Sequence, residues 1–196
     1  AASKDYHWER HIMRAAAIIL CGAAGILSGC GDKTVTATNA TPSEVAEKVA
    51  SAQNSEQFIS PGRWESTMTI QEMTIPGMPP ELAARMKSMT AKPKTFESCV
   101  TPEEAKKPKE DFFSGEADKS CRYDSFSMGG GVISAVMHCA SGGKKQTMKM
   151  NGTYGPDSYH IKVSTSASGG TAAEEMTMTA VMDAQRIGAC TGKEKS

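Results

Sequence analysis

Polar and apolar residues alternate along much of this chain, which is the pattern of β-strands that bury one face. The clearest run is residues 63–75 (RWESTMTIQEMTI), where apolar or small side chains alternate with charged or hydroxylic ones. The side chains on its apolar face are Trp64, Ser66, Met68 and Ile70. Further strands are expected at 94–100, 120–128, 132–140, 144–154, 158–167 and 174–182.

Short glycine-rich turns join the expected strands of the C-terminal half, at 129–131, 141–143 and 169–170. Strands of this length joined by such turns are typical of an up-and-down antiparallel sheet. Apolar residues on one face, with lysine, threonine and serine on the other, are expected when one side of the sheet meets water. The sequence therefore predicts a mainly β domain, a meander of about seven strands that forms a curled sheet or partial barrel, with two or three short helices.

Three segments carry helical signals. Residues 42–57 follow Thr41, an N-cap threonine, and have proline at their first position and Glu44 three residues after the cap, which is the chemistry of a helix start. Residues 81–89 place leucine and two methionines at helical spacing. Thr101 repeats the helix-start chemistry, and Pro108 stops that helix.

The N-terminal region does not fit the β pattern. Arg14 precedes thirteen apolar residues, 15–27, which are too few for a membrane-spanning helix of about 20 residues. A positive start and a short apolar run predict a secretory signal peptide over residues 13–29. Residues 1–12 precede this signal, and we interpret them as an upstream extension outside the folded protein.

The end of the apolar run, Leu27-Ser28-Gly29 directly before Cys30, resembles a bacterial lipobox. The resemblance implies cleavage before Cys30 and attachment of acyl chains, such as palmitate, to that residue. Two or three chains hold a protein on a membrane permanently. Gly31 follows the cysteine in place of aspartate, which implies the inner leaflet of the outer membrane, facing the periplasm. The alternative is an ordinary cleaved signal that leaves Cys30 as a disulfide partner.

Besides the lipid-bearing Cys30, four cysteines remain after the signal: Cys99, Cys121, Cys139 and Cys190. An even number in an exported chain predicts two disulfides, and the spacing contains no CxxC that would favour zinc. A three-residue turn at 129–131 would place Cys121 directly opposite Cys139 and leave Cys99 for Cys190. The competing connectivity is Cys99–Cys121 with Cys139–Cys190, which we favour because a bridge directly across a hairpin has restricted geometry.

These signals predict six segments along the chain. They are an upstream extension (1–12), a lipoprotein signal peptide (13–29), a flexible tether (30–41), a helical segment (42–60), the β domain (61–191) and a polar tail (192–196).

Charge and histidine content restrict the function. The chain has 22 basic and 22 acidic residues, so it lacks the basic surface of a nucleic-acid binder. His138 and His160 are the two histidines after the signal, and no GxSxG segment supplies a nucleophile. We interpret both histidines as ordinary strand residues, and we expect neither catalysis nor a cofactor.

Methionine is the unusual residue, with thirteen copies. Thioethers are soft ligands that select Cu(I), and the candidate metal ligands are Met148, Met150, Met176 and Met178. The simpler interpretation is that methionine replaces leucine as a flexible core filler, because the methionines follow the apolar alternation. A third hypothesis is an apolar small molecule or an envelope protein held on the concave face of the sheet.

Several short motifs occur together in one order. They are PGRWE at 61–65, IPGMP at 75–79, CVTPEE at 99–104, the mid-chain pair Cys121 and Cys139, and RIGAC at 186–190. In this order they resemble the family catalogued as domain of unknown function 3617, found in Gram-negative cell envelopes, over residues 58–191. The resemblance implies a small exported β domain with paired cysteines and assigns no catalytic residue. We therefore expect a lipid-anchored envelope protein with a binding or structural role, the alternative being a methionine-based Cu(I) handler.

Overall fold

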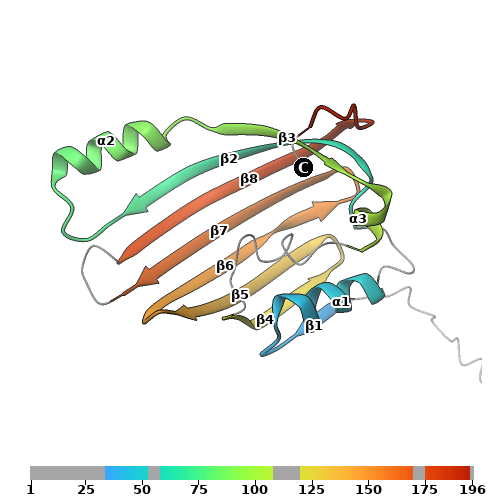
Figure 1. Cartoon of the computed structure of the whole chain (residues 1–196), viewed down its shortest axis with the longest axis horizontal. Helices are drawn as coiled ribbons and strands as arrows, with labels where there is room; N and C mark the ends of the chain where they lie inside the picture. Colours follow the sequence, from blue (N-terminus) through green and yellow to red (C-terminus); the bar gives the residue numbers. More distant parts are fainter. Residues whose placement is uncertain (1–33, 53–57, 108–119, 170–174, 195–196) are drawn as a thin grey trace, which may run out of the picture. The chain divides into compact units, whose positions relative to one another are not determined.

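The computed structural model describes residues 34–52, 58–107, 120–169 and 175–194, all within one compact unit, Asp32–Ser196. Over these residues the chain forms eight strands and three helices (Figure 1). In chain order they are β1 (Val35–Ala37), α1 (Pro42–Ala52), β2 (Gly62–Thr74), α2 (Pro80–Thr90), β3 (Lys94–Val100), α3 (Pro102–Lys106), β4 (Cys121–Gly129), β5 (Val132–Ser141), β6 (Lys144–Gly155), β7 (Ser158–Ser168) and β8 (Met176–Gly188).

All eight described strands lie in one antiparallel sheet with the order β1-β4-β5-β6-β7-β8-β2-β3. From β4 to β8 each strand pairs with the next along the chain, as in a meander. β2 pairs with β8, and β3 pairs with β2 to form one edge of the sheet. The sheet is not closed, because β1 and β3 have no neighbour on their outer sides among the described strands. The expected mainly β antiparallel fold is therefore confirmed.

Two expected boundaries are wrong. Residues 30–41 are expected to form a tether, but Val35–Ala37 form β1 and pair with β4; three residues are too few to show a period of two. The last strand continues to Gly188, well past residue 182. Its extension contains Ala184, which is small and buried, so it gave little hydrophobic signal in the sequence.

α1 packs on one face of the sheet, which we call the inner face, at the β1–β4 edge. Val45 is fully buried against a cluster that contains Tyr123 and Phe126. The expected capping box is present: the Thr41 hydroxyl accepts from the Glu44 backbone N–H at 3.2 Å, and the Glu44 carboxylate accepts from the Thr41 N–H at 2.7 Å. This second hydrogen bond also lowers the pKa of Glu44.

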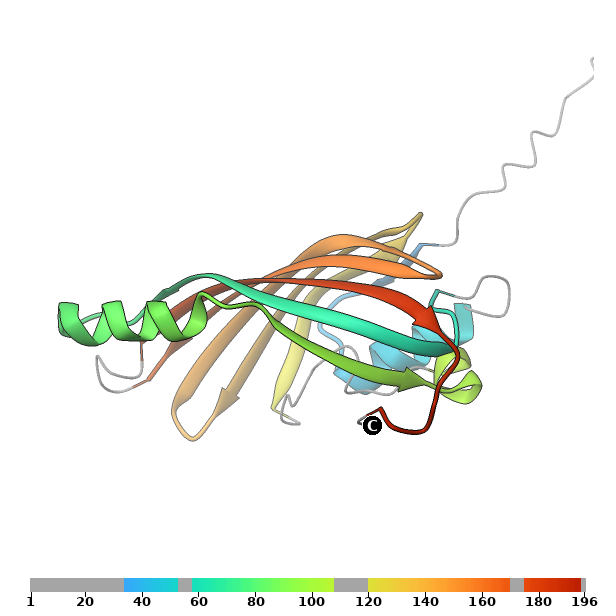
Figure 2. The same ribbon diagram turned by 90° about the horizontal axis from the view of Figure 1, so that it is seen from above.

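α3 lies on the same side of the sheet as α1 (Figure 2), near the start of β2. Its Ala105 is fully buried with Ile59, Trp64 and Ala184. Thr101 forms the expected N-terminal capping box of this helix. None of the described helices combines the length and apolar character that a membrane span requires.

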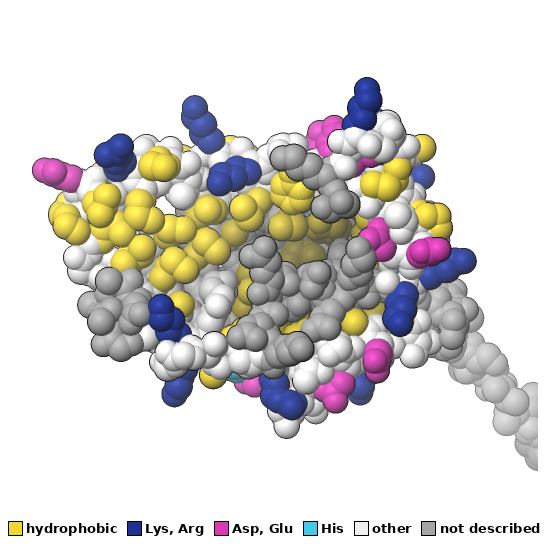
Figure 3. Space-filling model, viewed as in Figure 1, with side chains coloured by type: hydrophobic (Ala, Val, Ile, Leu, Met, Phe, Trp, Pro, Cys, Tyr) yellow, Lys and Arg dark blue, Asp and Glu magenta, His cyan; other side chains and the backbone are white. Residues whose placement is uncertain are grey.

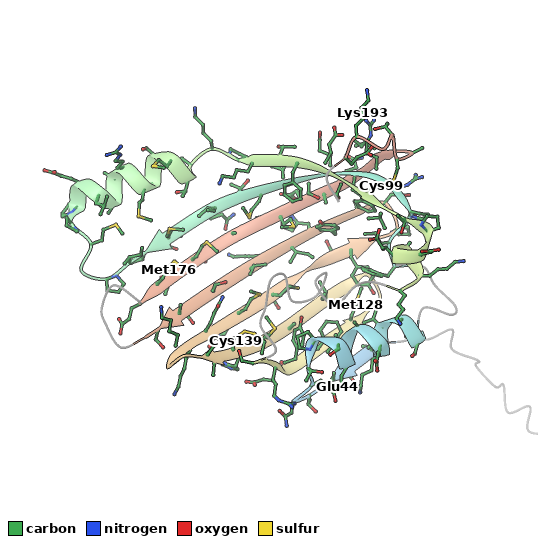
Figure 4. The ribbon with its side chains drawn as sticks, in the orientation of Figure 1. Glu44, Cys99, Met128, Cys139, Met176 and Lys193 are labelled. Atoms are coloured by element: carbon green, nitrogen blue, oxygen red, sulfur yellow. A yellow bond between two sulfur atoms is a disulfide. The ribbon has the colours of Figure 1, made fainter. Side chains whose placement is uncertain are left out.

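The two disulfides are Cys99–Cys190 and Cys121–Cys139, so the favoured connectivity is wrong and the competing one is present. A strict meander would place β3 beside β4, but β3 lies at one edge of the sheet and β4 lies next to the opposite edge. Cys99 and Cys121 therefore cannot meet. Figure 4 shows Cys99 and Cys139 far apart on the sheet.

Candidate functional site

Between α2 at one end and α1 and α3 at the other, the inner face carries a continuous set of half-buried apolar side chains from four adjacent strands. Figure 3 shows this hydrophobic band running from α2 along the sheet. We call it the methionine face. Its side chains are Met68, Ile70 and Met73 of β2, Met176, Met178 and Met182 of β8, Ile161 and Val163 of β7, and Met148 and Met150 of β6.

The four methionines that the sequence indicated as metal ligands all lie on this face, but in two separate groups. Met148 pairs with Thr165 of β7, and Thr165 pairs with Met178 of β8. β7 therefore lies between the β6 and β8 methionines, which places their backbones two strand spacings, about 10 Å, apart. Figure 4 shows Met176 at the end of β8 that lies toward α2. The structure brings these residues to one surface without joining them in one cluster.

The structure instead joins methionines that the sequence did not indicate as partners. Met68 lies opposite Met182, and Met73 lies opposite Met178, each pair across β2 and β8. Directly opposed residues of antiparallel strands have their side chains in contact range. These pairs could not be anticipated, because β2 and β8 are more than a hundred residues apart in the chain.

A bulge at Gln71 determines which way Met73 points. Strict alternation would place Met73 on the outer face of β2, together with Thr69. The register between β2 and β8 shifts between Ile70 and Glu72, so one extra residue enters β2 and the side chains after it change faces. Met73 consequently joins the inner face opposite Met178.

A groove lies where the methionine face meets α2. Its volume of about 540 Å³ falls in the range of small-molecule sites, roughly 300–1,000 Å³. It is lined on the β2 side by Ile70 and Met73 and on the α2 side by Ala83 and Met86. No residue of α2 is fully buried, so the helix borders the groove without sealing it.

At the other end of the inner face, Tyr159 closes the methionine face against Trp64. Its ring stacks on the indole, and its hydroxyl lies 3.3 Å from the Ser66 hydroxyl and 3.6 Å from the sulfur of Met182. Burial raises the pKa of this phenol, so Tyr159 stays neutral and serves as a polar tip on an otherwise apolar surface.

The two histidines lie on the outer face, and each contacts an aspartate that the sequence analysis did not pair with it. His160 Nδ1 lies 2.6 Å from Asp183, and His138 Nε2 lies 2.8 Å from Asp124. His138 Nδ1 also lies 2.9 Å from the Thr147 hydroxyl. The pairs join neighbouring strands, so strand pairing is the only signal that could have identified them.

Both histidine–aspartate pairs are roughly half exposed to solvent. Exposed pairs contribute only about 0–1 kcal/mol to stability, and water competes at an open surface for any group that would activate a nucleophile. Over the described residues, no group of three or more histidine, cysteine, aspartate or glutamate side chains is placed to hold a metal ion. The inner face is therefore the better candidate site.

The expected signal peptide, 13–29, and the expected lipidation site, Cys30, lie outside the described residues. Comparison with curated proteins found no match, and comparison with solved structures found none. The family model described as a protein of unknown function, DUF3617, matches residues 59–190. This match covers most of the chain and includes β2 to β8, both disulfides and the methionine face. The chain belongs to the DUF3617 family.

Proposed function

We propose that this chain is a lipid-anchored protein of the bacterial cell envelope whose β domain binds an apolar small molecule on the methionine face and catalyses no reaction. The observation that carries the proposal is the set of half-exposed apolar side chains across β6, β7, β8 and β2. Large contiguous apolar patches on a protein surface mark sites of interaction.

The chemistry of the face favours a flexible apolar ligand. Methionine side chains are unbranched and polarizable, so they adapt to ligands of varied shape. Val163 and Ile161 of β7 lie between the methionines of β6 and β8. Their β-branched side chains are less flexible than those of methionine. The Tyr159 hydroxyl, beside Ser66, offers a polar contact at one end of the face. Such a surface suits a molecule with a long apolar body and a small polar group.

The envelope location rests on the lipobox-like sequence that ends at Cys30 and on two disulfides in one small domain. Disulfides persist in oxidising compartments such as the periplasm. Gly31 favours the inner leaflet of the outer membrane, with the β domain facing the periplasm. Acyl chains on Cys30 would make the membrane its permanent partner.

The absence of catalysis is part of the proposal. It is supported by the open setting of the His138 and His160 pairs on the outer face. A nucleophile needs an adjacent base, and the transition state needs preorganised donors in a site that excludes water. We expect wild-type protein to hydrolyse p-nitrophenyl acetate no faster than the Thr147→Val variant; a wild-type rate well above that of the variant would refute this part.

Ligand binding is tested with N-phenyl-1-naphthylamine, an apolar probe that fluoresces when it leaves water. We expect the wild-type chain to bind the probe and long-chain fatty acids to displace it. Val163→Asp places a charge on the methionine face and should abolish the signal. Val132→Asp is the matched control, because Val132 is 55% exposed on the outer face.

Circular dichroism verifies that both valine variants fold, and Val163→Thr replaces Val163→Asp if the latter does not. Equal probe binding by the inner-face and outer-face variants would contradict the proposed site. Absence of binding by the wild-type chain would contradict the proposed function itself.

The anchor is tested by the intact mass of the protein extracted from membranes, with and without reductant. We expect a chain that starts at Cys30 and carries two or three acyl groups, and a gain of four hydrogens after reduction of the two disulfides. The Cys30→Ser variant should lose the acyl mass and leave the membrane fraction. An uncleaved, unmodified chain would contradict the envelope assignment.

A further inference from the structure

Three methionines from three consecutive segments line the groove between β2 and α2. Met73 comes from the end of β2, Met78 from the turn that follows, and Met86 from the middle of α2. All three are half-buried and line the groove. They are not the four methionines that the sequence analysis indicated, and they come together only because the chain turns back at this point.

The turn that returns the chain is encoded locally. The Met78 N–H donates to the Ile75 carbonyl at 3.3 Å, which closes a four-residue turn with Pro76 and Gly77 at its centre. Gly77 has a φ of +76°, the left-handed conformation that a type II turn requires at this position. The Pro-Gly pair therefore places Met78 next to the groove that Met73 borders.

A role in core packing does not explain why these three methionine side chains are only partly buried. The methionines that fill the core of this domain are almost completely buried: Met128 is 2% exposed and Met137 is 1% exposed. α2, in contrast, contributes no fully buried residue. Half-buried thioethers that share a groove remain available to a ligand, whereas those of Met128 and Met137 do not.

The donor set of the groove is soft and carries no net charge. Thioether sulfur is a soft ligand that selects Cu(I) over hard cations, which prefer carboxylate and carbonyl oxygens. The charged side chains among the lining residues are Glu72 and Lys87, one of each sign. Met178 stands directly opposite Met73 and is a neighbouring fourth thioether.

We propose that Met73, Met78 and Met86 form a thioether site that binds one Cu(I) ion in the groove between β2 and α2. This inference goes beyond the proposed function and does not depend on it, because a copper site needs sulfur, whereas an apolar ligand needs only apolar surface. The binding is a simple coordination step in which the neutral thioethers lose no protons and copper stays Cu(I).

The test is an anaerobic titration of the full chain against Cu(I) held by bicinchoninate, a coloured Cu(I) chelator, with ascorbate to keep copper reduced. N-ethylmaleimide first blocks any free thiol of Cys21 and Cys30, so that thiolates cannot bind the metal. The four cysteines of the β domain are already in disulfides. We expect the protein to withdraw one Cu(I) per chain from the chelator.

The decisive variant is Met73→Leu/Met78→Leu/Met86→Leu, which removes the sulfurs and keeps the apolar volume. Loss of an outer-shell partner already weakens metal sites by about 10–100-fold, so loss of all three ligands should weaken Cu(I) binding by at least roughly 100-fold. The matched control, Met148→Leu/Met150→Leu/Met176→Leu, changes three methionines of the methionine face that do not line the groove. It should bind Cu(I) as tightly as the wild type does.

The proposal is overturned if the wild-type chain takes no Cu(I) from the chelator. It is equally overturned if the groove variant binds as well as the wild type, or if the control variant loses as much affinity. The naphthylamine titration of the wild-type chain is run in parallel. A chain that binds copper through the groove and no probe would keep this inference and refute the proposed function.

Discussion

Trp64 and Tyr159 stack with their ring centroids 5.9 Å apart, although β8 runs between the strands that carry them. The β8 residue opposite Tyr159 is Ala184, so the two rings meet above a single methyl group. Ala184 is only 6% exposed and packs in the same cluster as Trp64. A small residue in the middle strand is therefore what allows aromatic rings of β2 and β7 to close one end of the methionine face.

The first prediction concerns this small residue. Ala184→Leu should destabilise the domain by about 1–3 kcal/mol, because the larger side chain pushes the two rings apart. Urea unfolding followed by circular dichroism measures the loss. Gln185→Leu is the matched control, since Gln185 is the next residue and is exposed. Equal stability of the two variants would show that Ala184 does not set the ring stacking.

The second prediction concerns the longer disulfide. Cys99 and Cys190 are 91 residues apart, and the loop-entropy relation gives about 4.6 kcal/mol for a bridge that closes such a loop. Cys99→Ala/Cys190→Ala should lower the free energy of unfolding by about that amount, as measured in urea.

The shorter bridge, Cys121–Cys139, provides the comparison. Its separation of 18 residues gives an entropic contribution of about 3.2 kcal/mol, to which the buried Cys121 adds lost packing when it is replaced. Peptide mapping without reductant should recover the two bridges as described. A linked peptide that contains Cys99 and Cys121 would refute the strand order as well as the connectivity.

The third prediction uses two glycines of β6. A side chain at Gly152 would overlap the carbonyl oxygen of His160 and lie 2.8 Å from the Cα of Ile161, whereas the nearest atom to a side chain at Gly155 is 3.9 Å away. Gly152→Ala should therefore destabilise the domain by about 1–3 kcal/mol. Gly155→Ala should cause no loss, because the added methyl group makes only an ordinary van der Waals contact. Thermal unfolding of both variants decides whether β6 and β7 approach this closely.

The fourth prediction concerns acid. The backbone N–H of Thr191 donates to the Glu194 carboxylate at 2.8 Å and lowers its pKa to about 2. Because the pKa is depressed in the folded state, this stabilisation is complete above the ordinary value of 4.5 and is lost as the pH falls from there through 2. An NMR titration of the Glu194 carboxyl carbon measures the midpoint. Thr191→Pro removes the donor and should move the midpoint back toward 4.5; an unchanged midpoint would contradict the cause.

Local patterns in the sequence were enough for most elements of the sheet. Alternation around Trp64 identified β2, and proline with a threonine cap identified α1 and α3. These signals depend on neighbouring residues, so they do not require knowledge of strand order. The meander from β4 to β8 followed for the same reason, because short glycine turns force successive strands to pair.

Pairing between distant strands could not be predicted. Nothing near residues 94–100 indicates that β3 lies at the edge opposite β1, and the connectivity of Cys99 depends on that placement. The pairing of Cys121 with Cys139 was one of the alternatives, but it was expected from a three-residue turn, which the hairpin does not have. Its turn has two residues, Gly130 and Gly131, and a bulge at Asp124 restores the register.

The position of Met73 in the candidate groove depends on one extra residue in β2, Gln71. Alternation along β2 assigns Met73 to the outer face, and only the bulge at Gln71 turns it inward. This bulge lies in a polar stretch without a glycine, so no residue pattern indicates the change of face. Met73 was consequently missed as a residue of the inner face, whereas Met148 and Met176, which follow strict alternation, were placed on the correct face.

If Cys30 carries the proposed lipid anchor, the edge strand β1 limits the distance between the domain and the membrane. Four residues separate Cys30 from Val35, the first residue of β1. The five Cα–Cα steps from Cys30 to Val35 span at most about 18 Å when the chain is fully extended. If Cys30 is acylated, Val35 is held within that distance of the lipid-bearing residue. The domain would then meet its ligands at the membrane surface itself and could not reach across the periplasm to collect them.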